Sequence, residues 1–560
     1  MTAHADFLPK ELGIYRDSSK DLECYITCCN QCCPTASTTT QGFSEDMLPL
    51  DPVTVLLSIV MCIFLAAVLY KEKEHVHPNY PPGPKPLPII GNILNLNVQK
   101  PHLSFQELAK KYGPVFSIKI GVQKVVVLCG YDTVKEALIN HAEEFSDRPS
   151  VPSIMDVTKG YGIGFTNGNN WKTMRQFTVS TLRDFGMGKR SLEEKINEES
   201  NCLVQMFKCY KGEPFDNTMV VHAAVANIIV SILLGQRFDY NDPKLQRIIT
   251  LINNIVRILG SPMALDLRNA CTKYHVCTTP GCWRIRLYNA FPSVMRWIPG
   301  SHQGIRKNTN ELHSFIREIF MKKRDQLDIN DQRSLIDCFL VKQKQEKPNP
   351  ERYFHDENLI SLLSDLFTGG METTGSTLRW SLLLMMKYPE IQKYVQKEIE
   401  KVIGLAEPQM AHRQQMPYTD AVIHEIQRFV DILPNNVPRS TTQDVTLKGC
   451  FLPKGTYIIP SLTSVLRDAK YFKKPDEFYP QHFLDADGNF VKIEAFLPFS
   501  AGKRGCAGAT MAKMELFLFF TKLLQNFTFK VPPGAKLDLS AAAGFIVLPQ
   551  KHEICAISRN

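Results

Sequence analysis

Hydrophobic residues are most concentrated near the start of the chain, in the run VTVLLSIVMCIFLAAVLY. This segment, 53–70, holds 18 residues without a charge, so it is just long enough to cross a bilayer as a helix. No Lys or Arg occurs between residues 33 and 52, whereas Lys71, Lys73 and Lys85 follow the run. Positive charge marks the cytosolic side of a membrane span. We therefore predict one transmembrane signal-anchor helix at 53–70, with the bulk of the chain in the cytosol.

The segments on either side of this run differ from it in composition. Residues 71–92 are basic and rich in proline, and proline fixes φ and prevents helix continuation. We interpret them as a stiff hinge. Residues 1–46 form a polar extension with the cysteines Cys24, Cys28, Cys29, Cys32 and Cys33. Because no histidine or second cysteine pair lies nearby to complete a zinc site, disulfides, lipidated thiols and an extension without function all remain open.

The remainder, 93–560, alternates between helical and strand-like patterns. LSFQELAKKYG, residues 103–113, has the period of an amphipathic helix, and VFSIKIGVQKVVVLCG, residues 115–130, alternates as a β-hairpin does. Helical periodicity dominates from about residue 131 to 430, and short strands and turns then lead to a last helix at 509–526. The fold class predicted is mainly α with a small β subdomain, forming one large catalytic domain.

Charge and cysteine content narrow the class of protein. Of the 560 residues, 44% are hydrophobic and 22% are charged, and the net charge of +9 is spread along the chain. This pattern argues against nucleic acid as a partner and leaves a basic patch for an acidic protein open. The sixteen cysteines make no disulfide framework over this length.

One cysteine stands in an unusual setting. FLPFSAGKRGCAGA, residues 496–509, has the pattern Phe499-x-x-Gly502-x-Arg504-x-Cys506-x-Gly508. Glycines allow a backbone to approach a flat macrocycle closely, and an arginine offers a charge-assisted fork to a carboxylate. A cysteine thiolate bound to haem iron favours cleavage of the O–O bond. The pattern therefore indicates a haem-thiolate loop, although an isolated cysteine before a helix is usually a structural one.

A second signal lies in DLFTGGMETTGSTLRWSLLLMM, residues 365–386. The apolar helix contains Gly369, Gly370, Glu372, Thr373 and Thr374 at its centre, and such residues weaken a plain core helix. We expect a distorted turn beside Glu372 and Thr373, two side chains that can relay protons.

These motifs resemble the cytochrome P450 superfamily, and more narrowly its microsomal family-2 enzymes, over about residues 47–560. The resemblance implies haem b, with Cys506 as the metal ligand and Thr373 and Glu372 as catalytic residues. It also implies that haem is bound by Trp171, Arg175, Arg439, Phe499, Arg504 and Gly508. A further implied feature is a structural lock between Glu425 and Arg428 and the segment 475–484, where His482 replaces a frequent arginine.

The same resemblance implies a monooxygenase in the endoplasmic reticulum membrane that oxidises a lipophilic small molecule. Electrons would come from NADPH–cytochrome P450 reductase, with cytochrome b5 as a second candidate donor. Both would dock on a basic face formed by Arg175, Arg183, Lys189, Arg190, Lys503 and Lys513. Substrate contacts would include Asp365, Gly369 and Thr373. The alternatives are a haem-thiolate isomerase or peroxygenase, and a haem-binding membrane protein without activity.

Two features depart from the family pattern. Residues 265–286 form an atypical insertion with three cysteines and no helical period, and Ala509 stands where relatives usually carry glutamate. The insertion falls between two helices that the resemblance places over the substrate channel.

Overall fold

The computed structural model describes residues 51–69, 77–88, 90–97, 100–260, 289, 296–297, 300–346, 352–542 and 545–559. The chain divides into two compact units, Met1–Ala66 and Ala67–Asn560. The predicted extension 1–46 and the predicted insertion 265–286 lie outside the described residues.

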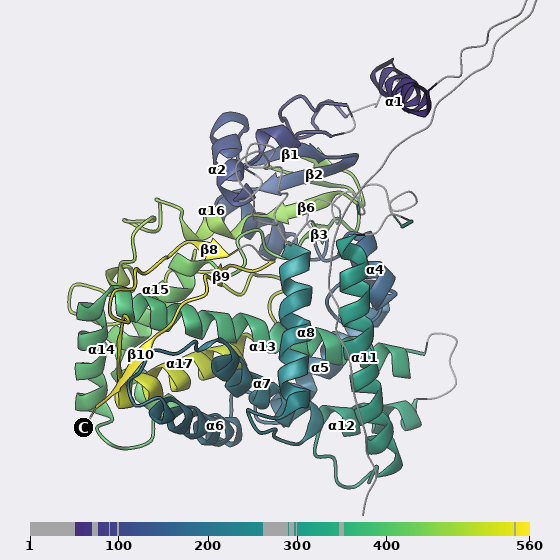
Figure 1. Ribbon diagram of the computed structural model, residues 1–560. Helices are drawn as coiled ribbons and strands as arrows, with labels where there is room; N and C mark the ends of the chain where they lie inside the picture. The colour runs from purple at the N-terminus through teal and green to yellow at the C-terminus, as the bar shows by residue number, and fades with distance from the viewer. Residues whose placement is uncertain are drawn as a thin grey trace, which may run out of the picture. The chain divides into compact units, whose positions relative to one another are not determined.

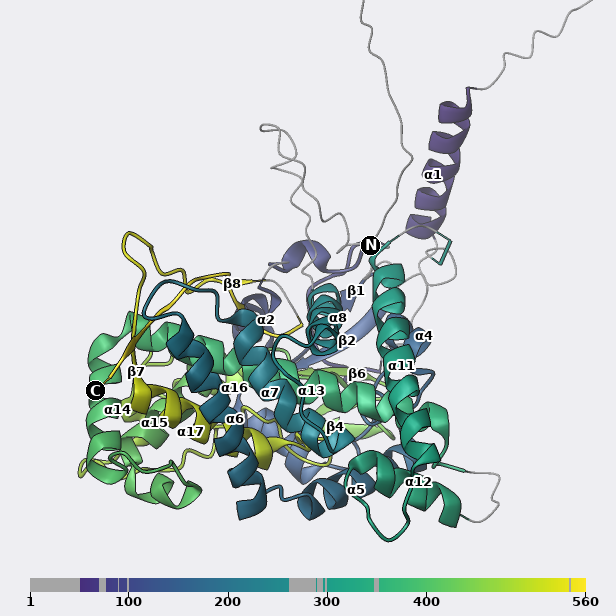
Figure 2. The same ribbon diagram turned by 60° about the horizontal axis from the view of Figure 1, so that its bottom comes forward.

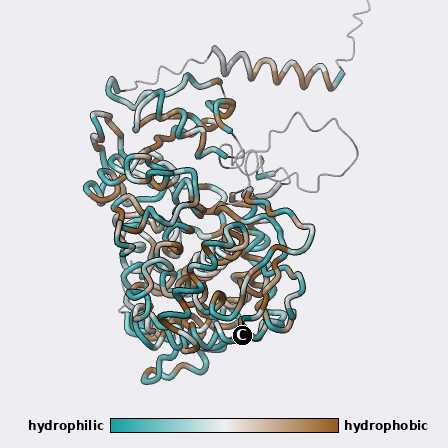
Figure 3. Tube along the Cα trace, turned by 90° about the vertical axis from the view of Figure 1, so that its left-hand side faces the viewer, coloured by the Kyte–Doolittle hydropathy of each residue, from teal (hydrophilic) through white to brown (hydrophobic). Residues whose placement is uncertain are grey.

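Helix α1, Pro52–Leu69, occupies the segment predicted to anchor the chain (Figure 1). Hydrophobic residues follow one another along its successive turns (Figure 3). Across the residues that the structure describes, no helix meets the combined length and hydropathy needed to cross a membrane. The membrane span therefore stays a prediction.

The larger unit begins with a small sheet. Strands β1, Val115–Ile120, and β2, Gln123–Leu128, pair antiparallel as the predicted hairpin, with Val115 opposite Leu128. Strand β6, Tyr457–Pro460, runs parallel to β2, and β3, Arg439–Ser440, closes the order β1-β2-β6-β3. The sheet thereby carries Arg439 on a strand far from the hairpin in sequence.

Helix α2, Pro101–Tyr112, packs on this sheet and is the predicted amphipathic helix. Proline at its first turn suits the helix start, and Gly113 ends it with a φ of 93°. Three further pairs of short strands lie elsewhere in the unit: β4 (Val445–Leu447) with β5 (Cys450–Leu452), β7 (Phe527–Lys530) with β10 (Cys555–Ser558), and β8 (Ala541–Ala542) with β9 (Leu548–Pro549).

Helices form most of the larger unit (Figures 1 and 2). They are α3 (Tyr131–Lys135), α4 (Pro152–Thr158), α5 (Gly168–Asp184), α6 (Arg190–Cys209), α7 (Thr218–Leu234), α8 (Pro243–Gly260), α11 (Ser301–Asp325), α12 (Leu335–Gln345), α13 (Asp356–Lys387), α14 (Pro389–Val402), α15 (Pro417–Val430), α16 (Leu462–Leu466) and α17 (Ala509–Asn526). The prediction of a mainly helical body with a small β part is confirmed, and so are the bounds of the last helix.

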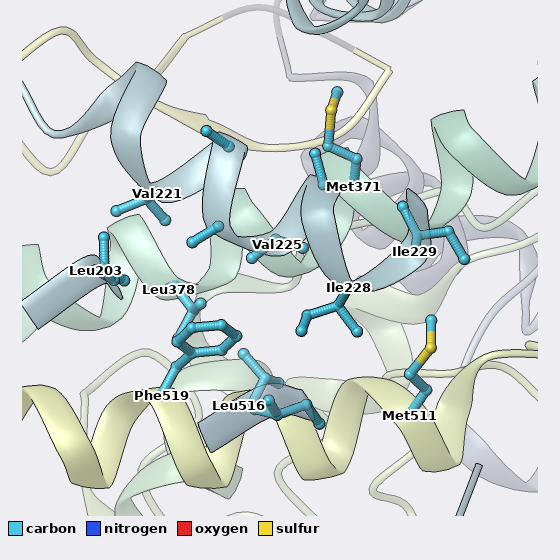
Figure 4. Packing of buried hydrophobic residues seen from close by; sticks show 14 of the residues in the cluster. Leu203, Val221, Val225, Ile228, Ile229, Met371, Leu378, Met511, Leu516 and Phe519 are labelled. Carbon is cyan, nitrogen blue, oxygen red and sulfur yellow. The ribbon is translucent and has the colours of Figure 1, made fainter. Parts of the chain in front are cut away.

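The core centres on α13, which packs against α7 and α17. Figure 4 shows Ile228 and Ile229 of α7 near Met371 of α13, with Met511 and Phe519 of α17 below them. All five side chains are at most 3% exposed. This packing joins the helix that carries Glu372 and Thr373 to the helix that follows Cys506.

Candidate active site

Close backbone contacts shape the loop that carries Cys506. The Cys506 N–H donates to the Phe499 carbonyl at 3.0 Å, and the Gly505 N–H donates to the Gly502 carbonyl at 3.0 Å. Gly502 has a φ of 72°, and a Cβ there would lie 1.8 Å from the Leu138 carbonyl oxygen. Only glycine fits both conditions, so the close approach predicted at this position is present.

Gly508 behaves differently from Gly502. Its φ is −94°, and an added Cβ would meet no protein atom of the described residues within 4 Å. Nothing in the protein alone therefore requires glycine at 508, and its predicted role beside the haem stays a prediction.

Two opposing effects act on the pKa of the Cys506 thiol. Burial raises the pKa of the Cys506 thiol, while the N–H of Gly508 and the charge of Arg175 act in the opposite direction. The side chain keeps an exposed surface even so. A metal ion bound at this surface would deprotonate the thiol outright, which suits Cys506 as the ligand.

Four guanidinium groups converge near this loop. Burial and the charges of Arg148, Arg504 and Arg175 hold the pKa of Arg439 well below its usual range. Burial and neighbouring arginines also lower the pKa of Arg504 to about 8 and that of Arg148 to about 9. Such a cluster is unfavourable unless anions neutralise it.

Two of these arginines already donate hydrogen bonds to backbone carbonyls. Arg504 donates to the carbonyls of Ser146 at 2.6 Å and Thr166 at 2.7 Å. Arg148 donates to the carbonyls of Val437 at 2.8 Å and Pro438 at 2.6 Å. These two arginines therefore fasten loops to one another, and Arg148 is a member of the cluster that no sequence pattern indicated.

Two N–H donors beside this cluster, on Arg439 and Trp171, are available to bind an anion. Arg439 donates to the Ser500 hydroxyl at 3.1 Å, but its Nε is buried and has no partner among the described residues. The indole Nε1 of Trp171 is buried and equally lacks a partner in the described part of the chain. Arg504 lies over the Trp171 ring at 3.7 Å, and Arg175 donates to the Gly505 carbonyl at 2.7 Å.

The residues present fit haem. Its iron needs a thiolate with an open face, which Cys506 supplies, and its two propionates need buried cations and N–H donors. Arg439 and Trp171 offer such donors beside two further guanidinium groups. Trp171 and Arg175 lie one turn apart on α5, as their spacing predicted. Arg504 stacks on the indole, and Arg175 donates to the cysteine loop.

The centre of α13 belongs to one continuous helix, which runs from Asp356 to Lys387. The Thr373 hydroxyl donates to the Gly369 carbonyl at 2.8 Å, one turn earlier, a contact that often bends a helix. A Cβ on Gly369 would meet no described atom within 4 Å, so this turn borders open space. A local distortion of this turn stays a prediction.

Glu372 faces away from this open turn. Its side chain is 2% exposed and points to α7, where His222 Nε2 lies 3.4 Å from Glu372 Oε2. The Ser376 hydroxyl donates to Glu372 Oε1 at 3.2 Å. Burial raises the pKa of Glu372, but His222, Ser376 and Arg379 outweigh it and leave the pKa below its usual value. Glu372 and Thr373 thus do not share one environment.

Asp365, expected to contact substrate, accepts two backbone hydrogen bonds. Its Oδ2 accepts the N–H groups of Ile163 at 2.8 Å and Gly164 at 2.9 Å. Burial raises the pKa of Asp365 to about 6 against these two hydrogen bonds. The carboxyl therefore holds the loop before α5 against α13.

The residues of the predicted lock lie together. Arg428 and Glu425 are fully buried and form two charge-assisted hydrogen bonds, of 2.6 and 2.7 Å. Arg428 also donates to the carbonyls of Pro475 and Glu477, both at 2.7 Å. His482 Nδ1 lies 3.1 Å from Glu425 Oε2, so a histidine fills the place that the resemblance gives to arginine.

Some cations of the predicted basic face form ion pairs with neighbouring carboxylates. Lys503 pairs with Glu143 at 2.6 Å and Arg190 with Glu194 at 3.2 Å. A hollow of about 510 Å³ lies beside Cys506, and Arg175, Arg183, Lys189 and Ala509 are among its lining residues.

Comparison with known proteins identifies the family. The family described as Cytochrome P450 matches residues 81–276 and 283–556, and the gap falls inside the segment 265–286. The chain is 45% identical over 511 residues to cytochrome P450 2C5 of Oryctolagus cuniculus, across 91% of this chain and 100% of that protein. It is 45% identical over 484 residues to cytochrome P450 2K4 of Oncorhynchus mykiss, across 86% and 92% of the two chains. It is also 45% identical over 482 residues to cytochrome P450 2C39 of Mus musculus, across 86% and 94%. The chain therefore belongs to the cytochrome P450 family, and it is a monooxygenase whose cofactor is haem.

Proposed function

We propose that this chain is a membrane-anchored haem-thiolate monooxygenase that oxidises a lipophilic small molecule with electrons from NADPH–cytochrome P450 reductase. Haem bound at Cys506 supplies dioxygen activation and oxygen insertion. Cys506 ligates the iron, Arg439, Trp171 and Arg175 bind the propionates, and Arg504 positions the Trp171 ring. Phe499 and Gly508 lie in the same loop as the ligand, and Thr373 borders the space over which α13 passes.

The observation that carries this proposal is an exposed cysteine in the same region as two buried N–H donors without partners, one on a guanidinium and one on an indole. Cys506 keeps an accessible side in a loop that Gly502 fastens to Leu138. Arg439 and Trp171 retain buried N–H groups without partners in the described chain. A planar group with a metal at its centre and two carboxylates at its edge satisfies both at once.

The test is the absorption spectrum of the reduced, carbon monoxide-bound protein. The full-length chain should show the strongly red-shifted Soret band of a thiolate ligand, and Cys506→Ala should lose it. Cys555→Ala is the matched control, because Cys555 is a buried cysteine in β10. A histidine-type Soret band in the parent chain would contradict thiolate ligation.

The electron donor is proposed from the charges beside Cys506. Arg183 and Lys189 line the hollow next to the ligand, and neither forms an ion pair with any residue the structure describes. Free cations suit an acidic donor protein such as the reductase or cytochrome b5. Product formed in step with NADPH oxidation would support the monooxygenase. Turnover that needs no reductase would favour an isomerase or peroxygenase.

The membrane anchor is proposed from α1. Its described side chains include Val53, Leu56, Leu57 and Met61, which are 59%, 63%, 61% and 61% exposed. Apolar side chains exposed on successive turns favour lipid contact, and the basic residues after 70 favour a cytosolic catalytic domain. We propose the endoplasmic reticulum as the membrane. Alkaline carbonate should leave the full chain in microsomes and release a chain that starts at residue 77.

A further inference from the structure

The contact between His222 and Glu372 has no role in the predicted chemistry. His222 is 1% exposed in α7, and its Nε2 faces Glu372 Oε2 across 3.4 Å. The ring lies so close to α13 that a Cβ on Gly375 would stand 2.9 Å from His222 Cδ2. Glycine at 375 therefore makes room for an imidazole beside the acid.

The hydrogen bonds of His222 determine where protons must be. Nδ1 lies 2.7 Å from the Thr218 carbonyl, and because a carbonyl only accepts, Nδ1 carries a hydrogen. A neutral ring would then turn the lone pair of Nε2 toward a carboxylate oxygen. Two acceptors facing each other inside a protein are unfavourable, so the pair must hold one additional proton, on His222 Nε2 or on Glu372 Oε2.

Charged groups around the pair decide which of these forms prevails. Arg379 of α13 lies near both Glu372 and Asp216, and Arg257 of α8 lies near Arg379. Arg379 Nε donates to Asn217 Oδ1 at 3.4 Å, at the start of α7. These cations favour a carboxylate at Glu372.

We propose that His222 holds the proton that Glu372 passes toward the Thr373 turn, an assignment that rests on the monooxygenase function proposed above. In this step the N–H bond at His222 Nε2 breaks and an O–H bond at Glu372 Oε2 forms. The imidazolium and the carboxylate become a neutral imidazole and a carboxylic acid, and no electrons move. Glu372 lies directly before Thr373 in α13, so rotation of its side chain carries the acid proton toward the open turn.

Asp216 stands just before α7 and contacts solvent. Its side chain is 33% exposed and lies 3.7 Å from Lys551 Nζ. It accepts the Thr218 N–H at 2.9 Å, at the same turn of α7 whose carbonyl binds His222. The pair is thus buried but stands within one helical turn of a group that contacts water.

The first test needs no turnover. Thermal unfolding is measured for the full chain and for His222→Gln, Glu372→Gln and the double variant. A shared proton makes the two residues one unit, so we expect the double variant to lose no more than the worse single variant. Strictly additive losses would overturn the proposal, whether or not the protein binds haem.

The second test measures the fate of electrons without any added substrate. NADPH, dioxygen and hydrogen peroxide are followed with reductase present, in H2O and in D2O. His222→Gln should slow water formation about tenfold, raise the peroxide fraction and increase the solvent isotope effect, since general acid catalysis is worth at least that much. His313→Gln, a change at a half-buried histidine of α11, is the matched control and should match the parent.

The outcomes separate the two proposals. If His222→Gln unfolds at a lower temperature but keeps the parent's peroxide fraction and isotope effect, the histidine only packs against α13 and the proposal is wrong. If the parent itself lacks the thiolate Soret band, the proposed function fails, while the unfolding cycle still decides whether His222 and Glu372 share a proton.

Discussion

Gly502 lies against the carbonyl oxygen of Leu138 so closely that a Cβ on residue 502 would stand 1.8 Å from it. With a φ of 72° the position is also strained for any other residue. Gly502→Ala must therefore displace the cysteine loop or the chain at Leu138, and we expect loss of haem incorporation. Haem content per chain measures this. An added Cβ at Gly508 would meet no described protein atom, so Gly508→Ala should leave the thermal stability of the apoprotein unchanged, whereas Gly502→Ala should lower it. Equal losses of apoprotein stability in the two variants would contradict the role given to Gly502.

The buried pair of Glu425 and Arg428 gives a prediction about stability. Arg428→Lys cannot make the two parallel bonds to the carboxylate or reach all of the Arg428 carbonyl partners. Breaking a buried pair costs about 3–5 kcal/mol, so the free energy of unfolding, measured with denaturant, should fall by about that amount. Arg413→Lys is the control, because Arg413 pairs with Asp420 at 22% exposure; a similar shift there would contradict the prediction.

Arg439 is predicted to affect the apoprotein and the haem complex in opposite directions. Its guanidinium is repelled by Arg148, Arg504 and Arg175, so Arg439→Gln should raise the melting temperature of the apoprotein. The same change removes a charge-assisted bond to a propionate, worth about 1.5–3 kcal/mol, so haem affinity should fall about tenfold to a hundredfold. Haem titration and thermal unfolding of the apoprotein measure the two effects.

Arg504→Gln should change the melting temperature of the apoprotein in the opposite direction from Arg439→Gln. Because Arg504 bonds the carbonyls of Ser146 and Thr166, its loss should lower the melting temperature of the apoprotein. If both arginine variants destabilise the apoprotein equally, repulsion within the cluster is not the dominant effect.

The burial of the Glu515 carboxyl in α17 predicts that the free energy of unfolding depends on pH. The side chain is fully buried, and neither carboxyl oxygen has a hydrogen-bond partner among the described residues. Burial raises its pKa from 4.5 to about 8, with Thr374 opposing. The folded chain then binds a proton that the unfolded chain has released, so this group makes stability fall as pH rises from 4.5 to about 8 and level off above.

The measurement compares the parent with Glu515→Gln between pH 5 and pH 8. The parent should lose a few kcal/mol of unfolding free energy more than the variant over this interval, since one pKa unit corresponds to about 1.4 kcal/mol. Glutamine keeps the shape of the side chain but does not titrate. Parallel curves for the two proteins would show that Glu515 does not carry a raised pKa.

The basic hollow beside Cys506 predicts salt-sensitive reduction. Arg183→Glu and Lys189→Glu should raise the reductase concentration needed for half-maximal NADPH oxidation, and the effect should shrink as ionic strength increases. Lys401→Glu, an exposed change on α14, is the control for net charge. A shift of equal size with Lys401→Glu would mean that overall charge, not this face, governs docking.

Local patterns predicted the elements of this fold and the candidates for its chemistry. Alternation over 115–130 predicted the β1–β2 hairpin, and helical periodicity predicted α17 at its observed bounds. The spacing of Glu425 and Arg428 puts both on one helix face, and the family resemblance implied that they form the lock. Each of these depends on residues that are neighbours in sequence, so backbone geometry alone brings them together.

Tertiary packing decided which of these side chains meet. Arg148 joins the arginine cluster from a loop without a motif, Arg504 lies over Trp171, and Glu372 faces His222 of α7. Such contacts join segments far apart in the chain, and no periodicity records them. They follow from how α5, α7, α13 and the cysteine loop pack, because a buried charge settles against whichever partner the packing brings within reach.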